Sequence, residues 1–131
     1  MTQIILVTGG TGLVGSAIRK VIKSDVRINN NMVFIFLSRQ DGDLTKEKDV
    51  ISIFEKYKPT HIIHLAACVG GLYKNMNNKL KMYTENMKIN QNILHYGYKY
   101  GVIKIISCLS TCIFPNKVTY PINESMLHNG L

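Results

Sequence analysis

The sequence has 131 residues, the length of one domain, and 46% of them are apolar, which excludes a disordered chain. No apolar run approaches the about 18 residues that a membrane helix needs, so we expect no membrane partner. The formal net charge of +8 favours anionic partners, but the basic residues are scattered and form no run of five. We therefore expect a lysine-rich surface and no nucleic acid partner.

The chain contains three cysteines, Cys68, Cys108 and Cys112. An odd number, with no secretory leader ahead of the first predicted strand, argues against a disulfide framework and for a cytoplasmic protein. There is no CxxC pair and the histidines lack the spacing of zinc ligands, so we expect no metal. We expect Cys108 to be a small core residue.

The first third of the chain changes from a strand pattern to a helix pattern and back. Residues 3–8 form a short, continuous apolar run, which is typical of a strand buried on both faces of a parallel sheet. After the glycines at 9–12 the period becomes helical, and the following residues share one apolar stripe that we expect to face inward: Leu13, Ala17, Ile18, Val21 and Ile22. Residues 32–37 predict a second buried strand.

The remainder alternates in the same way. Thr45 is a plausible N-cap for a helix over 46–57, and Pro59 ends that helix. The residues expected to face inward are Val50, Ile51, Ile53 and Phe54. Residues 61–65 predict a strand, 66–78 a glycine-containing loop, 80–100 a long helix closed by Gly101, and 104–109 a fourth strand. No periodicity is evident in 110–131.

The order βαβαβαβ predicts an α/β fold, because parallel strands need crossover helices. We expect a Rossmann-like doubly wound parallel sheet that is incomplete, with about four strands in the order 3-2-1-4.

A glycine-rich loop lies between the first strand and the first helix. The segment TGGTGLVG contains both GxGxxG and GxxGxxG. Glycines allow a tight turn and a close approach of the backbone to a pyrophosphate, and the helix N-terminus attracts the phosphates. The alternative is a glycine-rich turn of an unrelated α/β fold. The cofactor-binding candidates here are Gly9, Gly10, Thr11, Gly12, Leu13, Val14 and Gly15.

The residues after the second strand favour NADP(H) over NAD(H). NAD-specific sites usually have an acidic residue there, whereas this chain has Ser38 and Arg39. A guanidinium can pair with a 2′-phosphate that a carboxylate would repel. The alternative is that Arg39 points to solvent and Asp41 is the acidic residue. Asp43 and Leu44 are candidates for contact with the adenine, although Asp43 could be an ordinary turn residue ahead of a helix.

Several segments resemble a known family. TGGTGLVG, the Asp43-Leu44 pair and LAA at 65–67 are similar to extended short-chain dehydrogenases/reductases. The segments PTHIIHLAA at 59–67, VGG at 69–71, SCLSTCIFP at 107–115 and YPINE at 120–124 are similar to those of the GDP-L-fucose synthase family, over nearly the whole chain.

This resemblance implies an activity. Members of that family epimerise GDP-4-keto-6-deoxy-D-mannose at C3 and C5 and then reduce C4 with NADPH. The residues implied to line the nicotinamide side are Ala66, Ala67, Val69 and Gly70. By the same resemblance Ser110 polarises the sugar ketone and Cys112 acts in epimerisation, and the complete protein is a homodimer. A hydroxyl donor and a thiol agree with that chemistry.

One part of the family pattern is missing. The resemblance implies a Tyr-x-x-x-Lys pair on a helix after the fourth strand, but the pair present, Tyr100 and Lys104, precedes Ser110 and is interrupted by Gly101. We therefore expect residues 1–131 to be the N-terminal portion of an NADP(H)-binding Rossmann domain, without the substrate domain and with little activity alone.

Two other functions stay open at this point. One is an NADP(H)-binding module without turnover, and the other is a different nucleotide-sugar epimerase or dehydratase, against which the cysteine of CLSTCIFP argues. We also expect the fourth strand to be an apolar sheet edge that lowers solubility or is covered by a partner.

Overall fold

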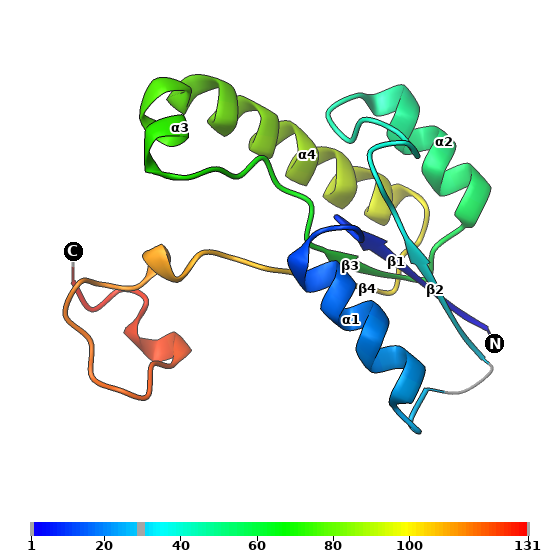
Figure 1. Ribbon diagram of the computed structural model, residues 1–131, viewed down its shortest axis with the longest axis horizontal. Coiled ribbons are helices and arrows are strands. Elements are labelled where there is room, and N and C mark those ends of the chain that lie inside the picture. The colour runs from blue at the N-terminus through cyan, green and yellow to red at the C-terminus, as the bar shows by residue number, and fades with distance from the viewer. Residues whose placement is uncertain (1, 29–30, 131) are drawn as a thin grey trace.

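A four-stranded, wholly parallel sheet forms the centre of the computed structural model, which describes residues 2–28 and 31–130 (Figure 1). This confirms the predicted fold class. In chain order the elements are β1 (Gln3–Thr8), α1 (Leu13–Ser24), β2 (Met32–Phe36), α2 (Glu47–Tyr57), β3 (His61–His64), α3 (Leu72–Asn77), α4 (Lys79–Lys99), β4 (Lys104–Ser107) and the 3₁₀ turns η1 (Thr111–Ile113) and η2 (Glu124–Met126).

The strand order is β2-β1-β3-β4, so the expected order 3-2-1-4 is wrong. That order places the third strand outside the second. Here the segment after β2 forms turns, in which the amides of Ser38 and Thr45 donate to the carboxylates of Asp41 and Asp43. The helix α2 then carries the chain back across β1, so β3 pairs with β1 on the side away from β2. Thr60 places β3 beside β1, because its amide donates to the Ile4 carbonyl at 2.9 Å and its hydroxyl accepts from the Ile4 amide at 2.8 Å.

The winding places the helices on two faces of the sheet. The connection from β1 to β2 crosses the sheet in one direction, and the next two connections cross it in the other. Because parallel crossovers are right-handed, a reversal of direction moves the helix to the opposite face. Accordingly α1 lies on one side of the sheet and α2 and α4 lie together on the other (Figure 1).

The hydrophobic core lies between the sheet and the α2–α4 layer. Leu6 and Ile62 from the sheet are fully buried against Phe54 of α2 and Ile93 of α4. The inward face predicted for α2 is confirmed, with Ile51 half-buried and its other three members buried. Asn92 of α4 adds a polar contact to this layer, since its amide donates to the Leu44 carbonyl at 2.9 Å.

The helix α1 is much less buried than its apolar stripe predicted. Leu13 is 90% exposed and Val21 is also exposed, while Ile18 and Ile22 are half-buried and Gly15 is buried. Among the described residues α1 is the only helix on its side of the sheet (Figure 1), so one flank of the stripe has nothing to pack against.

Several boundaries also differ from expectation, and β4 ends at Ser107 rather than at residue 109. Thr45 does not cap α2: the residue before the helix is Lys46, without a side-chain cap, and the Thr45 hydroxyl donates to Asp43 instead. Residues 66–78 are not all loop, because they contain α3. The end of α2 before Pro59 is as predicted, and Lys58 there adopts a left-handed conformation with φ of 47°.

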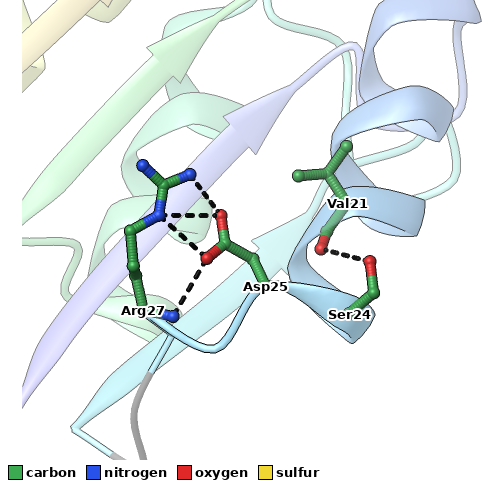
Figure 2. A network of polar contacts seen from close by, with 4 residues as sticks. All are labelled: Val21, Ser24, Asp25 and Arg27. Atoms are coloured by element: carbon green, nitrogen blue, oxygen red, sulfur yellow. Dashed lines mark hydrogen bonds and ion pairs between the residues drawn. The ribbon is translucent and has the colours of Figure 1, made fainter.

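The chain leaves α1 through a short turn held by Asp25 (Figure 2). The Asp25 carboxylate accepts bonds from the Arg27 backbone amide at 2.9 Å and from the Arg27 guanidinium at 2.6 to 3.2 Å. These bonds lower the pKa of Asp25 to about 2. The Val21 carbonyl at the end of the helix accepts from the Asp25 amide at 3.0 Å and from the Ser24 hydroxyl at 3.2 Å.

Two apolar surfaces are exposed. The strand β4 lies at the edge of the sheet, as predicted, and its Ile106 is 51% exposed. One stripe of α4 is also exposed, with apolar side chains at intervals of three, four and seven residues: Leu80, Tyr83, Met87, Leu94 and Tyr98. None of the helices in the described ranges is both long and apolar enough to cross a membrane.

Candidate functional site

The direction of winding reverses between β1 and β3, which are neighbours in the sheet. The loops that follow these strands, residues 9–12 and 65–71, therefore leave the sheet in opposite directions. Ligands of open α/β sheets bind outside the carboxyl ends of the strands at such a place. We call these two loops the switch point.

The glycine loop after β1 is closely packed on its surroundings. Gly9 has a φ of +66°, and a Cβ there would lie 3.0 Å from the Ala66 nitrogen. A Cβ on Gly10 would lie 2.7 Å from the Phe36 Cβ, and one on Gly15 would lie 2.7 Å from the backbone of Gly10. These three predicted positions therefore require glycine. Gly9 lies against the other loop of the switch point, Gly10 lies against β2, and Gly15 lets α1 pack on the glycine loop.

The N-terminus of α1 is free to bind an anion. Its N-cap is Gly12, which has no side chain that could accept from the first amides of the helix, and the first turn contains no acidic residue. The unpaired amides and the positive end of the helix dipole favour a phosphate. The exposure of Leu13 and Val14 agrees with an open approach to this turn. The cradle therefore fits a dinucleotide pyrophosphate.

The end of β2 is linked to the glycine loop, since the Gly10 amide donates to the Leu37 carbonyl at 2.9 Å. Beyond it Ser38 binds the Asp41 carboxylate through its amide and its hydroxyl, both at 2.8 Å. The Ser38 amide and hydroxyl lower the pKa of Asp41, as does a bond from Tyr57. Asp41 is thus engaged within its own turn, whereas Arg39 is exposed and makes no hydrogen bond or ion pair with the described residues.

Asp43 and Leu44 follow in the same connection, ahead of α2. The Asp43 carboxylate accepts from the hydroxyl and the amide of Thr45 at 2.7 and 3.0 Å, and these bonds lower its pKa. Lys46 lies 3.6 Å away as an ion-pair partner. Asp43 therefore organises the turn ahead of α2, which is the structural role that the sequence left open, and Leu44 packs against the core.

A buried polar network joins the ends of β1 and β3. The Thr8 hydroxyl lies 2.7 Å from Nδ1 of His64, and Nε2 of His64 lies 3.0 Å from Oδ1 of Asn90 on α4. The amides of Leu65 and Ala66 both donate to the Thr8 hydroxyl oxygen at 3.1 Å. Burial lowers the pKa of His64 below 6.5.

The loop after β3 is held by α4. The side chain of Asn86 accepts from the Cys68 amide at 2.6 Å and donates to the Cys68 carbonyl at 2.9 Å. A groove of about 530 Å³ lies beside this loop, lined by residues 68–70 and by side chains of α3 and α4 that include Met76 and Tyr83. The Glu85 carboxylate raises the pKa of the Cys68 thiol, which disfavours a nucleophilic role for it.

Ser110 and Cys112 lie beyond the carboxyl end of β4. The Ser110 hydroxyl oxygen accepts from the Cys112 amide at 3.1 Å, at the start of η1, and both residues are exposed. Cys108 is exposed as well, so its expected place in the core is wrong: the chain leaves the sheet after Ser107 and no described element covers it.

The structure brings most of the predicted cofactor residues together, but the two predicted catalytic residues lie apart from them. The glycine loop contacts the end of β2 and the Ala66 backbone, while the segment with Ser110 and Cys112 extends away from the sheet (Figure 1). The described residues contain no group of three or more histidine, cysteine or carboxylate side chains placed to hold a metal ion.

A family model of NAD-dependent epimerases/dehydratases matches residues 5–130, nearly the whole chain. The chain belongs to this family.

Individual members of the family are similar along the same span. The GDP-L-fucose synthase of Dictyostelium discoideum is 52% identical over 126 residues, which are 96% of this chain and 39% of that protein. The probable GDP-L-fucose synthase of Drosophila melanogaster is 50% identical over the same shares. The crystal structure of the GDP-L-fucose synthetase of Naegleria fowleri bound to NADP superposes with a TM-score of 0.83 at 49% identity, covering 99% of this chain and 39% of that one. The chain thus spans about two fifths of the length of these epimerase/dehydratase relatives.

Sequence reasoning missed three polar residues of the site: His64, Asn86 and Asn90. The signal for His64 was present, because it shares the buried face of β3 with Ile62 and a histidine at such a position needs partners. The two asparagines gave no such signal, since polar residues are common on a helix of this composition and only the fold shows which of them face the β3 end.

The close approaches of the glycine loop predict the effect of adding one methyl group. Gly15→Ala should lower the free energy of unfolding by about 1–3 kcal/mol despite the better helix propensity of alanine, because the new Cβ meets Gly10 backbone that cannot move freely. Gly71→Ala, where a Cβ has nothing within 4 Å, is the control and should change it by less than about 1 kcal/mol. Urea unfolding measures both, and equal losses would contradict the packing described for the loop.

Proposed function

We propose that the chain is the NADP(H)-binding part of an epimerase/reductase that converts GDP-4-keto-6-deoxy-D-mannose to GDP-L-fucose. The observation that carries the proposal is the 52% identity to a GDP-L-fucose synthase over residues that include the glycine loop, the loop after β3 and the SCLSTCIFP segment. We infer a cytoplasmic location from the three free thiols, which suit a reducing compartment.

The fit of the cofactor rests on the glycine loop and on charge. The loop and the uncapped N-terminus of α1 would hold the pyrophosphate, and Arg39, a cation with no partner among the described residues, would pair with the 2′-phosphate. Asp41 is engaged by Ser38, which supports NADP(H) rather than NAD(H). The loop with Ala66, Ala67, Val69 and Gly70 would hold the nicotinamide side. When bound, NADPH supplies the hydride for reduction at C4.

The chemistry of the substrate would rest on Ser110 and Cys112. One lone pair of the Ser110 hydroxyl is used by the Cys112 amide, which leaves its proton to donate to a ketone oxygen. A bond from Ser110 to the ketone oxygen would also lower the barrier to removing a proton from the neighbouring carbon. Cys112, on the same turn, would take that proton as a thiolate and return a proton to the carbon as the thiol so formed. We infer that these two residues act together on a keto sugar placed beyond the carboxyl ends of β3 and β4.

Cys112→Ser tests the proposed activity in the native gene product. We expect deuterium incorporation from D₂O at C3 and C5 of the keto sugar to fall by about 10²–10⁴-fold, because the proton-exchanging group is lost, while NADP(H) still binds. Cys108→Ser is the matched control, since it changes an exposed thiol of the same segment and should leave the exchange unchanged. Normal exchange in Cys112→Ser would remove the assignment to fucose synthesis.

The exposed stripe of α4 supports a homodimer. Apolar residues at intervals of three and four residues on one helix face are suited to packing against a second helix. We infer that two copies pair through this stripe. Sedimentation equilibrium should give a dimer for the native protein and a monomer for Leu94→Glu, while Tyr73→Glu on α3 should remain dimeric. A monomeric native protein would contradict the pairing.

A further inference from the structure

The last residues of β1 and β3 are paired in register and buried together. Thr8 is opposite His64 in the ladder, and their side chains are 0% and 4% exposed. Both point to the α2–α4 side of the sheet, where Asn90 meets the far side of the imidazole ring. The three side chains thus come from three elements that meet at the switch point.

The hydrogen bonds of Thr8 determine the protonation of His64. A threonine hydroxyl has one proton to donate and two lone pairs. The amides of Leu65 and Ala66 occupy both lone pairs, so the proton must point to Nδ1 of His64 at 2.7 Å. Nδ1 therefore accepts and carries no proton.

The other ring nitrogen completes the assignment. Nε2 lies 3.0 Å from the oxygen of the Asn90 side chain, which can only accept, so Nε2 carries the proton. One neutral tautomer of His64 satisfies every partner. We propose that His64 is a positioning residue for the cofactor site, which holds the loops after β1 and β3 together through the Thr8 hydroxyl only while its imidazole is neutral.

A second proton on the ring would break this arrangement. A protonated Nδ1 would face the Thr8 hydroxyl proton, and the hydroxyl could turn away only by giving up its bond to the Leu65 or the Ala66 amide. The groups that face the ring are Thr8 from β1 and Asn90 from α4, and neither of them titrates. Among the described residues no charged group shifts the pKa of His64, which burial lowers and the Asn90 bond partly raises.

The sign of the pH dependence follows from that lowered pKa. Above about pH 6.5 the ring is neutral in both the folded and the unfolded chain, and the network contributes its full stability. As the pH falls below 6.5 the unfolded chain takes up a proton before the folded chain does, and stability declines until the folded pKa is passed.

The backbone that the network holds is part of the cofactor site, so this inference rests on the proposed function. A Cβ on Gly9 would lie 3.0 Å from the Ala66 nitrogen, which means that the two loops touch directly at that point. A shift of the Leu65–Ala66 backbone would therefore change the separation between the pyrophosphate loop and the nicotinamide loop. His64 would act on the cofactor through the backbone, without touching it.

Two substitutions of His64 separate positioning from packing. In His64→Asn the side-chain oxygen takes the place of Nδ1 and still accepts from Thr8, whereas in His64→Gln the amide reaches the place of Nε2 and leaves Thr8 without an acceptor. We expect His64→Gln to weaken NADP(H) binding about tenfold and to speed hydrogen exchange of the Leu65 and Ala66 amides, and His64→Asn to stay close to wild type in both. Thr8→Val and Thr8→Ser form a second pair. Thr8→Val removes the hydroxyl and should behave like His64→Gln, whereas Thr8→Ser keeps it and should stay close to wild type.

A spectroscopic measurement tests the tautomer without the cofactor. In the ¹⁵N spectrum of labelled histidine, His64 should be the Nε2–H form and should take up its second proton at a lower pH than an unperturbed histidine. Equal losses in His64→Asn and His64→Gln, or unchanged Leu65 and Ala66 exchange in His64→Gln, would overturn the positioning role. Failure of the wild-type chain to bind NADP(H) would instead overturn the proposed function.

Discussion

The adjacency of β1 and β3 is the constraint on which the remaining structure depends. The two strands come from different crossover units. They are joined at one end by the hydrogen bond between the Ile4 amide and the Thr60 hydroxyl, and at the other by the hydrogen bond between the Thr8 hydroxyl and His64. Once they are neighbours, the connections on either side must run in opposite directions, and right-handed crossovers then place α1 on one face and α2 with α4 on the other. The loops after β1 and β3 meet at the carboxyl edge as a result, and the predicted cofactor residues gather there.

The two faces of the sheet are covered in different ways. On the α2–α4 side large side chains such as Phe54 and Ile62 fill the space between the layers. On the α1 side the helix begins directly on the backbone of the glycine loop, and no room is left for a Cβ at Gly15. A tight loop at the start of a helix without a side-chain cap is the arrangement that leaves amides for phosphate oxygens. The packing of α1 and its capacity to bind an anion therefore have one cause.

Local patterns in the sequence predicted the elements and the glycine loop well, because both depend on neighbouring residues. The strands and the inward face of α2 could be inferred from the hydrophobic period, and the glycine loop from its spacing. The strand order could not, since it depends on which strands meet in space: the carboxylates of Asp41 and Asp43 bind their own turns, and Thr60 then holds β3 beside β1. Burial of Leu13 and Val21 was overestimated because amphipathicity shows which face is apolar but not how much of it another element covers. His64 was missed because its role exists only when β1, β3 and α4 come together. The predicted parts of Arg39, Ser110 and Cys112 stay predictions.

The central claim is that a dinucleotide with a 2′-phosphate binds at the switch point. Titration of the ¹⁵N-labelled chain with NADP⁺ and with NAD⁺ tests it most directly. The account predicts amide shifts confined to residues 9–15, Ser38, Arg39 and 66–70, at lower concentrations of NADP⁺ than of NAD⁺, and a smaller difference between the two in Arg39→Ala. Shifts centred away from the loops after β1, β2 and β3, or equal affinity for the two nucleotides, would contradict it.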